Sequence, residues 1–184
     1  MRTYKLIKID YSRYRKDNPN LFKILKLSIS RGNFRAIFLF RIANSLKRKK
    51  LNFISSLLIK LMNHFSHCYI NVNASIGEGF LISHVGGIII GGKTKIGKFC
   101  DIRQNVTFGG NFNRKDNQGN SQPILSDYVS VGAGACILGP VKIGSHSIIG
   151  ANSVVTRDVD ERVIVSGIPA VEIKKVWSDG ERKL

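Results

Sequence analysis

The chain has 184 residues, 43% of them hydrophobic, which suits one globular domain with an appendage. Its three cysteines form no spaced framework, and their odd number favours a reducing, cytoplasmic compartment over a disulfide-rich secreted fold. The start of the chain lacks the apolar core of a secretory signal, and no run of about 18 apolar residues predicts a membrane-spanning helix.

The formal net charge of +17 is concentrated in the first part of the chain. Residues 1–68 hold 16 Lys/Arg and 2 acids, a net charge of +14, whereas residues 69–184 hold 13 Lys/Arg and 10 acids. Nucleic acid is one partner that such a segment could attract. No helix-turn-helix, zinc-finger or RNA-binding signature accompanies the charge, so we expect no nucleic-acid partner.

Residues 1–65 are predicted to form a basic, mainly helical segment, with breaks at Gly32 and in the basic stretch 47–52. Apolar side chains recur between Phe34 and Met62 at roughly helical spacing, interleaved with Arg and Lys. One interpretation packs this apolar face on the rest of the protein or on a sister subunit. The other places it on an anionic membrane surface, which would make the protein peripheral on the inner face of the plasma membrane.

A six-residue repeat of aliphatic residues dominates the second part of the chain. Neither an α-helix nor an alternating strand has this period, which is typical of a parallel β-helix, where each six residues form one short strand and one turn. Stacked coils then build one continuous apolar column. We therefore predict a left-handed parallel β-helix over residues 66–166. The repeat residues are Ile70, Ile76, Ile82 and Ile88, then, after a slip of two residues, Ile96, Ile102 and Phe108, and further on Val131, Ile137, Ile143, Ile149 and Val155.

Residues 109–123 interrupt the repeat with a polar segment that contains three Gly and four Asn. A long segment of this kind within a compact coil is usually functional or disordered. We predict an excursion loop that leaves the β-helix and returns before Ile124. Residues 167–184 are predicted to be a C-terminal tail, which begins Gly-Ile-Pro-Ala and ends in charged, frayed residues.

Several stretches of the β-helical part resemble the serine acetyltransferase branch of the hexapeptide-repeat acyltransferases. These stretches are ISHVGGIIIGGKTKIG, VTFGG, VGAGACILGPVKIG, IIGANSVV and SGIPA, and the slip of two residues fits the same pattern. The resemblance covers residues 70–170, whereas the helical segment is shorter than in serine acetyltransferases. It implies a homotrimer that binds acetyl-CoA, the acetyl donor, in a groove between neighbouring β-helices. It also implies acetyl transfer to a hydroxyl or an amine.

His84, in the stretch Ser-His-Val-Gly-Gly, stands where the resemblance places the catalytic base. An acceptor hydroxyl must lose its proton as it attacks the thioester, and histidine, with an unperturbed pKa of about 6.5, is suited to accept that proton. Backbone amides near the thioester would stabilise the oxyanion. We expect the His84 side chain to face outward toward a neighbouring subunit, with Gly86 and Gly87 leaving space beside it. The alternative is a surface histidine with no role.

Three positions depart from the serine acetyltransferase pattern. Tyr69 replaces the Asp that orients the catalytic histidine, Ser83 replaces the Asp before that histidine, and Gln122 replaces a histidine of the excursion loop. Because the missing groups help to recognise a small zwitterionic amino acid, the chain looks closest to the polysaccharide and sugar O-acetyltransferases of this branch. We therefore predict direct acetyl transfer to a sugar hydroxyl of a surface polysaccharide or its precursor. A serine O-acetyltransferase of cysteine synthesis and a non-catalytic trimeric scaffold are the alternatives.

The resemblance also suggests which residues contact acetyl-CoA. They are Gly109, Gly110, Ala133 and Ala151 along the pantetheine arm, and Lys174 and Lys175 at the nucleotide phosphates. Tight coils need small residues in any case, and the two lysines would equally suit a solvated surface.

The remaining reactive side chains indicate neither a metal site nor an acyl-enzyme. His64, His67 and Cys68 lack a second half-site, so we expect no metal. Cys100 and Cys136 have no paired base nearby in the sequence, which favours direct transfer over a covalent intermediate.

Overall fold

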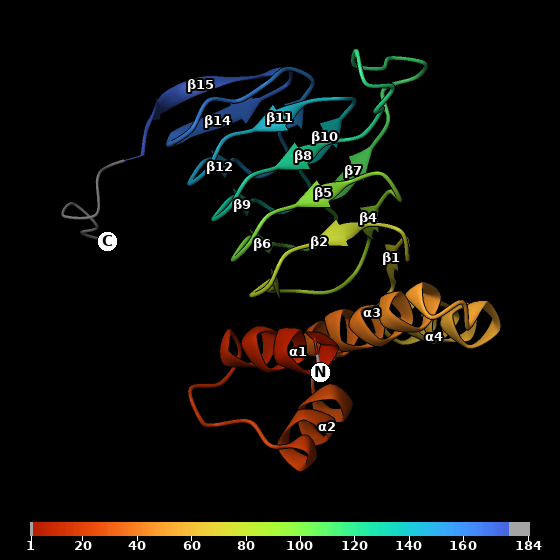
Figure 1. Ribbon diagram of the computed structural model, residues 1–184. Helices are drawn as coiled ribbons and strands as arrows, with labels where there is room; N and C mark the ends of the chain where they lie inside the picture. The colour runs from red at the N-terminus through yellow and green to blue at the C-terminus, as the bar shows by residue number, and fades with distance from the viewer. Residues whose placement is uncertain (1, 177–184) are drawn as a thin grey trace.

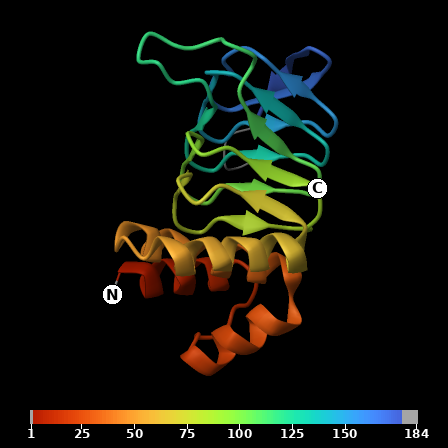
Figure 2. The ribbon, with the colours of Figure 1, turned by 90° about the vertical axis from the view of Figure 1, so that its right-hand side faces the viewer.

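Four helices lie at one end of a tall β-helix in the computed structural model, which describes residues 2–176 (Figure 1 and Figure 2). Three of them form a layer against the coils, and the second lies beyond this layer. The helices are α1 (Arg2–Ser12), α2 (Leu21–Ser30), α3 (Gly32–Arg48) and α4 (Asn52–Ser66). Asn20 begins α2 because its side-chain oxygen accepts a hydrogen bond from the Lys23 backbone N–H at 2.9 Å. No helix of the described residues is long and apolar enough to cross a bilayer.

The β-helix is a stack of coils, and each of the first four gives one short strand to each of three sheets. The last coil meets sheet B only through an isolated bridge between Val159 and Ile143. Sheet A contains β1 (Cys68–Ile70), β4 (Ile88–Ile90), β7 (Thr107–Gly109), β10 (Cys136–Leu138) and β13 (Val154–Val155). Sheet B contains β2 (Ser75–Ile76), β5 (Lys95–Ile96), β8 (Ile124–Leu125) and β11 (Lys142–Ile143). Sheet C contains β3 (Leu81–Ile82), β6 (Asp101–Ile102), β9 (Ser130–Val131), β12 (Ile148–Ile149), β14 (Val163–Gly167) and β15 (Ala170–Lys175). Among these strand pairs, only β14 and β15 are antiparallel. The predicted fold, a left-handed parallel β-helix with N-terminal helices, is confirmed.

The repeat residues stack in register and form the buried core. In sheet A the column is Ile70, Ile90, Phe108, Ile137 and Val155; in sheet B it is Ile76, Ile96, Leu125 and Ile143; in sheet C it is Ile82, Ile102, Val131, Ile149 and Val165. Burying one such side chain contributes about 1.5–3 kcal/mol, so the column is the main source of stability. Each side of a coil takes six residues, so residues six apart in the sequence occupy equivalent positions on successive sides. The six-residue period therefore marks the residues that point inward.

The slip of two residues lies one step earlier than the repeat pattern suggested. Ile90, and not Ile88, pairs in register with Ile70, so eight residues separate Ile82 from the next inward column position. Ile88 is also buried, because the first and last residues of β4 both point inward. Since Ile88 follows Ile82 by six residues, the sequence pattern assigned it, incorrectly, to the inward column. The two additional residues therefore lengthen the corner between β3 and β4, which carries His84.

The helices α1 and α3 close the open end of the apolar column. Ile7, Phe34, Ile37 and Phe40 are buried in the same cluster as the residues of the first coil. This arrangement fits the interpretation that packs the apolar face of the segment on the rest of the protein. The helices α2 and α4, in contrast, leave several large apolar side chains exposed, namely Leu21, Phe22, Leu25, Ile29, Phe53, Ile54, Leu57 and Phe65.

A buried ion pair joins the helical layer to the first coil. Arg41 of α3 contacts Asp10 of α1 through Nε at 2.8 Å and through Nη2 at 3.2 Å, and both side chains are almost fully buried. Arg41 also donates to the backbone carbonyls of Ile76 and Gly77, and Asp10 accepts from the Phe80 N–H at 3.1 Å. The pair thus satisfies backbone groups of the first coil that no further coil covers.

The chain leaves the β-helix after Gly109 and returns at Ile124. This excursion projects from the side of the coils (green in Figure 2). Its tip is ordered by Asp116, whose carboxylate accepts from the backbone N–H groups of Gln118 and Asn120. Arg114 connects the loop to a later coil through the carbonyl of Thr156 at 3.2 Å. At the C-terminal end, β15 folds back on β14, and the charged end predicted to fray, residues 177–184, lies outside the described residues.

Candidate active site

His84 lies in the lengthened corner where the chain passes from sheet C to sheet A. The corner joins β3 to β4, and its Gly86 and Gly87 have φ values of 109° and 63°. These left-handed conformations favour glycine, which explains the Gly-Gly pair after His84. The His84 side chain is exposed on the single chain. An imidazole in this position is accessible to a substrate.

The helical segment holds the strand that leads into this corner. Since β3 is the last strand of sheet C, the N–H and C=O of Ile82 have no strand partner below them. The Tyr14 hydroxyl accepts from the Ile82 N–H at 3.0 Å and donates to the Ile82 carbonyl at 3.1 Å. Burial raises the pKa of Tyr14 above its ordinary value, so the hydroxyl keeps the proton that it donates. Asn33 adds a hydrogen bond from Nδ2 to the Ser83 carbonyl at 3.0 Å.

Replacing Tyr14 with Phe is expected to destabilise the fold by about 1–3 kcal/mol, because it leaves both backbone groups of Ile82 without a partner. Chemical denaturation at a fixed protein concentration measures the change. Tyr4→Phe is the matched control, since Tyr4 is exposed on α1, the helix that precedes Tyr14. Equal stability of the two variants would show that Tyr14 does not support β3.

The corners between sheet C and sheet A stack into one edge of the β-helix. Backbone hydrogen bonds connect them: Asn105 donates to Gly86 at 2.8 Å, Gly134 donates to Gln104 at 3.0 Å, and Asn152 donates to Ala133 at 2.8 Å. Of the residues predicted from the sequence, the structure therefore brings His84, Ala133 and Ala151 to the same edge. Ala133 is half-buried and Ala151 is exposed, so small side chains line the upper part of this edge.

The other predicted contacts to acetyl-CoA lie elsewhere on the single chain. Gly109 and Gly110 lie at the opposite side of sheet A, where the excursion loop begins. Lys174 and Lys175 lie on β15, at the far end of sheet C from His84, and both are exposed.

Gln104 was not singled out from the sequence. The pairing of Ile82 with Ile102 places it in the corner one coil above His84. Its Oε1 atom is buried and has no hydrogen-bond partner among the described residues. Such a group is rare in a folded protein and marks an available acceptor beside the site. The sequence carried no signal for it, because one glutamine in a polar corner looks like a solvated residue.

No carboxylate of the described residues contacts His84. Tyr69 is exposed on β1, and Ser83 contributes only backbone hydrogen bonds. The Gln122 side chain is used within the chain: its Oε1 accepts from the Lys93 N–H at 2.7 Å and from the Thr94 hydroxyl at 3.2 Å. The positions that depart from the serine acetyltransferase pattern thus supply neither an acid nor an imidazole.

Two of the three cysteines, Cys68 and Cys100, are poor nucleophiles. Burial raises the pKa of the Cys100 thiol to about 11 and also raises the pKa of Cys68, so both hold their protons at neutral pH. Within residues 2–176, no three His, Cys, Asp or Glu side chains gather in a way that could hold a metal ion.

Known proteins resemble this chain in both sequence and fold. Residues 123–157 match the family model "Bacterial transferase hexapeptide (six repeats)". The chain is 34% identical over 166 residues to a serine acetyltransferase of Synechococcus elongatus, covering 90% of this chain and 67% of that protein. The serine acetyltransferase of Neisseria gonorrhoeae in complex with serine has a TM-score of 0.79 at 29% identity, covering 92% of this chain and 68% of that chain. The serine acetyltransferase of Brucella abortus in complex with coenzyme A has a TM-score of 0.81 at 26% identity, covering 95% and 68%.

The coils, their register and these matches define a hexapeptide-repeat transferase. More narrowly, the chain belongs to the serine acetyltransferase family. It is therefore an enzyme, an acetyl-CoA-dependent acyltransferase, and the hypothesis of a non-catalytic scaffold is wrong.

Proposed function

We propose that the protein transfers the acetyl group of acetyl-CoA to the hydroxyl group of serine, with His84 as the general base. Identity of 34% to a serine acetyltransferase over 90% of the chain carries this proposal, since it favours serine over the sugar acceptor predicted from the sequence. The exposed imidazole in its glycine-containing corner supplies the base that the reaction needs.

In this reaction His84 removes the proton from the hydroxyl as its oxygen attacks the carbonyl carbon of the thioester. The carbon–sulfur bond then breaks, and the thiolate of CoA leaves and takes the proton from His84. A general base of this kind contributes about 10²–10⁴-fold to the rate. The two substrates react directly, which agrees with the protonated state of the buried Cys68 and Cys100 thiols.

A sugar hydroxyl of a surface polysaccharide or its precursor is the second candidate acceptor. One observation favours it: Tyr69, Ser83 and Gln122 replace the two acids and the histidine that the family resemblance associates with a small amino acid. The structure engages Gln122 in hydrogen bonds to Lys93 and Thr94, so it is not directed at an acceptor. A binding site without these charged groups suits a neutral polyol better than a zwitterion.

Transfer from labelled acetyl-CoA to serine, compared with transfer to a panel of free and nucleotide-linked sugars, tests the two candidates. The proposal expects saturable transfer to serine with a kcat/KM above that for any sugar. Saturable transfer to a sugar together with undetectable transfer to serine would establish the second candidate instead.

We also propose that the active enzyme is a homotrimer in which a neighbouring chain completes the site. His84 is exposed on the single chain. The predicted contacts for acetyl-CoA are scattered over three places: the edge beside His84, the far side of sheet A at Gly109 and Gly110, and β15 at Lys174 and Lys175. A second β-helix against this edge would exclude water and bring these residues together.

Light scattering at micromolar concentration is expected to give a mass of three chains of 20.5 kDa each. A trimer should form because the exposed edge and the exposed apolar faces of α2 and α4 otherwise stay in water. A mass of one chain under these conditions would contradict the proposal.

Attraction of residues 1–65 to an anionic membrane surface stays a prediction. The relatives named above give no support for it, and part of the apolar face on which it depended is buried under the first coil. What remains in its favour is the net charge of +14 on residues 1–68 beside the exposed apolar side chains of α2 and α4.

A further inference from the structure

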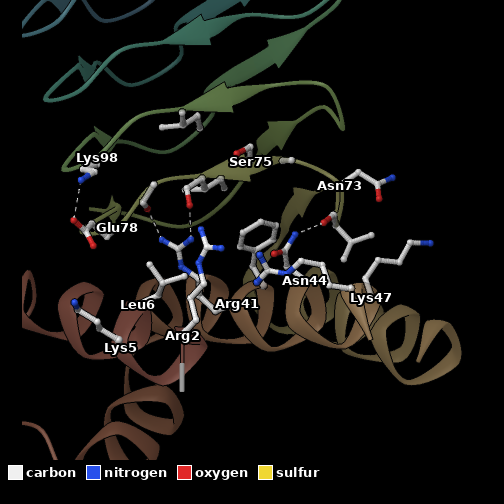
Figure 3. A pocket seen from close by; sticks show the side chains of 17 residues that line it. Arg2, Lys5, Leu6, Arg41, Asn44, Lys47, Asn73, Ser75, Glu78 and Lys98 are labelled. Carbon is white, nitrogen blue, oxygen red and sulfur yellow. Dashed lines mark hydrogen bonds and ion pairs between the residues drawn. The ribbon is translucent and has the colours of Figure 1, made fainter. Parts of the chain in front are cut away.

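A cleft of about 710 Å³ lies between the helical layer and the first coil (Figure 3). Its lower wall is formed by the first turn of α1 and the last turns of α3, and its upper wall by residues 72–78 of the first coil with Ile96 and Lys98 of the next. This volume is within the range of small-molecule binding sites. The reaction proposed for His84 makes no use of it.

The lining of the cleft is strongly basic. Glu78 is the only acid among the described lining residues. Six cationic side chains line the cleft, namely Arg2, Lys5, Arg41, Lys47, Arg48 and Lys98. Two of the six have anionic partners, since Arg41 pairs with Asp10 at 2.8 Å and Lys98 pairs with Glu78 at 3.3 Å. The other four make no ion pair with the described part of the chain.

The walls of the cleft favour an anion for a second reason. The carbonyl oxygens of Ile76 and Gly77 would repel a negative ligand, but both already accept hydrogen bonds from Arg41. The carbonyl of Val72 is likewise bonded by Asn44 at 2.7 Å. In addition, the first turn of α1 holds no acid, so the positive end of its helix dipole is not neutralised there.

The unpaired cations come from two directions. Arg2 and Lys5 belong to the start of α1, whereas Lys47 and Arg48 belong to the end of α3. Figure 3 shows Lys5 and Lys47 at opposite ends of the cleft, with Arg2 and Arg41 between them. A single carboxylate matches only one of these cations. Two linked phosphoryl groups, each with about one to two negative charges and several strong acceptor oxygens, can pair with cations from both helices.

The cleft and His84 lie on different sides of the first coil. The cleft is lined by the corner before β2, by β2 itself and by the corner after it, on sheet B. His84 occupies the corner between sheets C and A, which is opposite to sheet B in a three-sided coil. A ligand in the cleft therefore leaves the catalytic edge free.

We propose that this cleft is a second binding site, which takes a ligand through a diphosphate group. The diphosphate lies beside Arg2 in the middle of the cleft, where Arg41 holds the wall. The long side chains of Lys5, Lys47 and Arg48 turn toward it from the two ends. The rest of the ligand projects from the open side of the cleft. The diphosphate could belong to a soluble nucleotide or to a lipid-linked carrier, and the two sources share the chemistry that the cleft recognises.

Calorimetric titration of the full chain with inorganic pyrophosphate tests the proposal. We expect saturable binding with one site per chain, which weakens as added salt screens the charges. The double variants Arg2→Gln/Lys5→Gln and Lys47→Gln/Arg48→Gln should each weaken binding by about tenfold or more. The control Lys60→Gln/Lys142→Gln removes the same charge from exposed positions outside the cleft and should leave the affinity unchanged. Thermal unfolding of each variant verifies that it is folded.

Parallel titrations with UDP and farnesyl diphosphate distinguish the two sources. Tighter binding of UDP than of pyrophosphate indicates a soluble nucleotide, and tighter binding of farnesyl diphosphate indicates a lipid-linked carrier. Equal affinity for all three probes indicates that the diphosphate alone is recognised. Pyrophosphate that fails to bind, that binds the cleft variants as tightly as the wild-type protein, or that is displaced by saturating CoA would overturn the proposal of a separate site. None of these titrations depends on which acceptor is acetylated.

Discussion

Replacing His84 with Ala is expected to lower the turnover number by about two to four orders of magnitude, the usual contribution of a positioned general base. The fold and the affinity for CoA should change little, because the side chain is exposed and makes no hydrogen bond with the described residues. The residual rate should come from the orientation of the two bound substrates. Steady-state kinetics with labelled acetyl-CoA, together with calorimetric titration of CoA, measures both effects.

His64→Ala is the matched control, since His64 is also an exposed histidine but lies on α4. The control variant should keep a turnover number near that of the wild-type protein. Turnover near the wild-type value in His84→Ala would assign the base to another residue.

Replacing Arg41 with Leu is expected to destabilise the protein by about 3–5 kcal/mol, because it leaves the buried Asp10 carboxylate without its partner. The carbonyls of Ile76 and Gly77 also lose their donors, so the attachment of the helical layer to the first coil should weaken first. Chemical denaturation at a fixed protein concentration measures the change, since oligomerisation would otherwise shift the midpoint.

The double variant Arg41→Leu/Asp10→Leu should be less destabilised than the sum of the two single variants, because it leaves no unpaired buried charge. Lys23→Gln breaks the exposed Lys23–Asp17 pair and should have little effect, since water screens that pair. A loss of stability in Arg41→Leu no greater than in Lys23→Gln would show that the buried pair does not hold the two parts together.

The β-helix could be predicted from the sequence because its signal is local and repeated. Each aliphatic residue of the six-residue period, such as Ile102 or Ile143, points inward for the same geometric reason. The pattern can therefore be recognised without knowing which distant residues are in contact. The glycine-rich stretch around His84 and its match to a known family were likewise readable from consecutive residues. The acceptor was not readable in the same way, because the departures at Tyr69, Ser83 and Gln122 predicted a sugar, whereas the relatives favour serine.

What the tertiary structure decided depends on residues far apart in the chain. The exact position of the slip required the register of Ile70 with Ile90, because Ile88 is buried as well and fits the period equally. The supports of the His84 corner, Tyr14 and Asn33, come from the turn after α1 and from the start of α3, in a segment whose sequence shows only an amphipathic pattern. The basic cleft exists because α1 and α3 meet the first coil there. A charge count shows that the helical segment is basic, but only packing determines which cations stay unpaired and face one another.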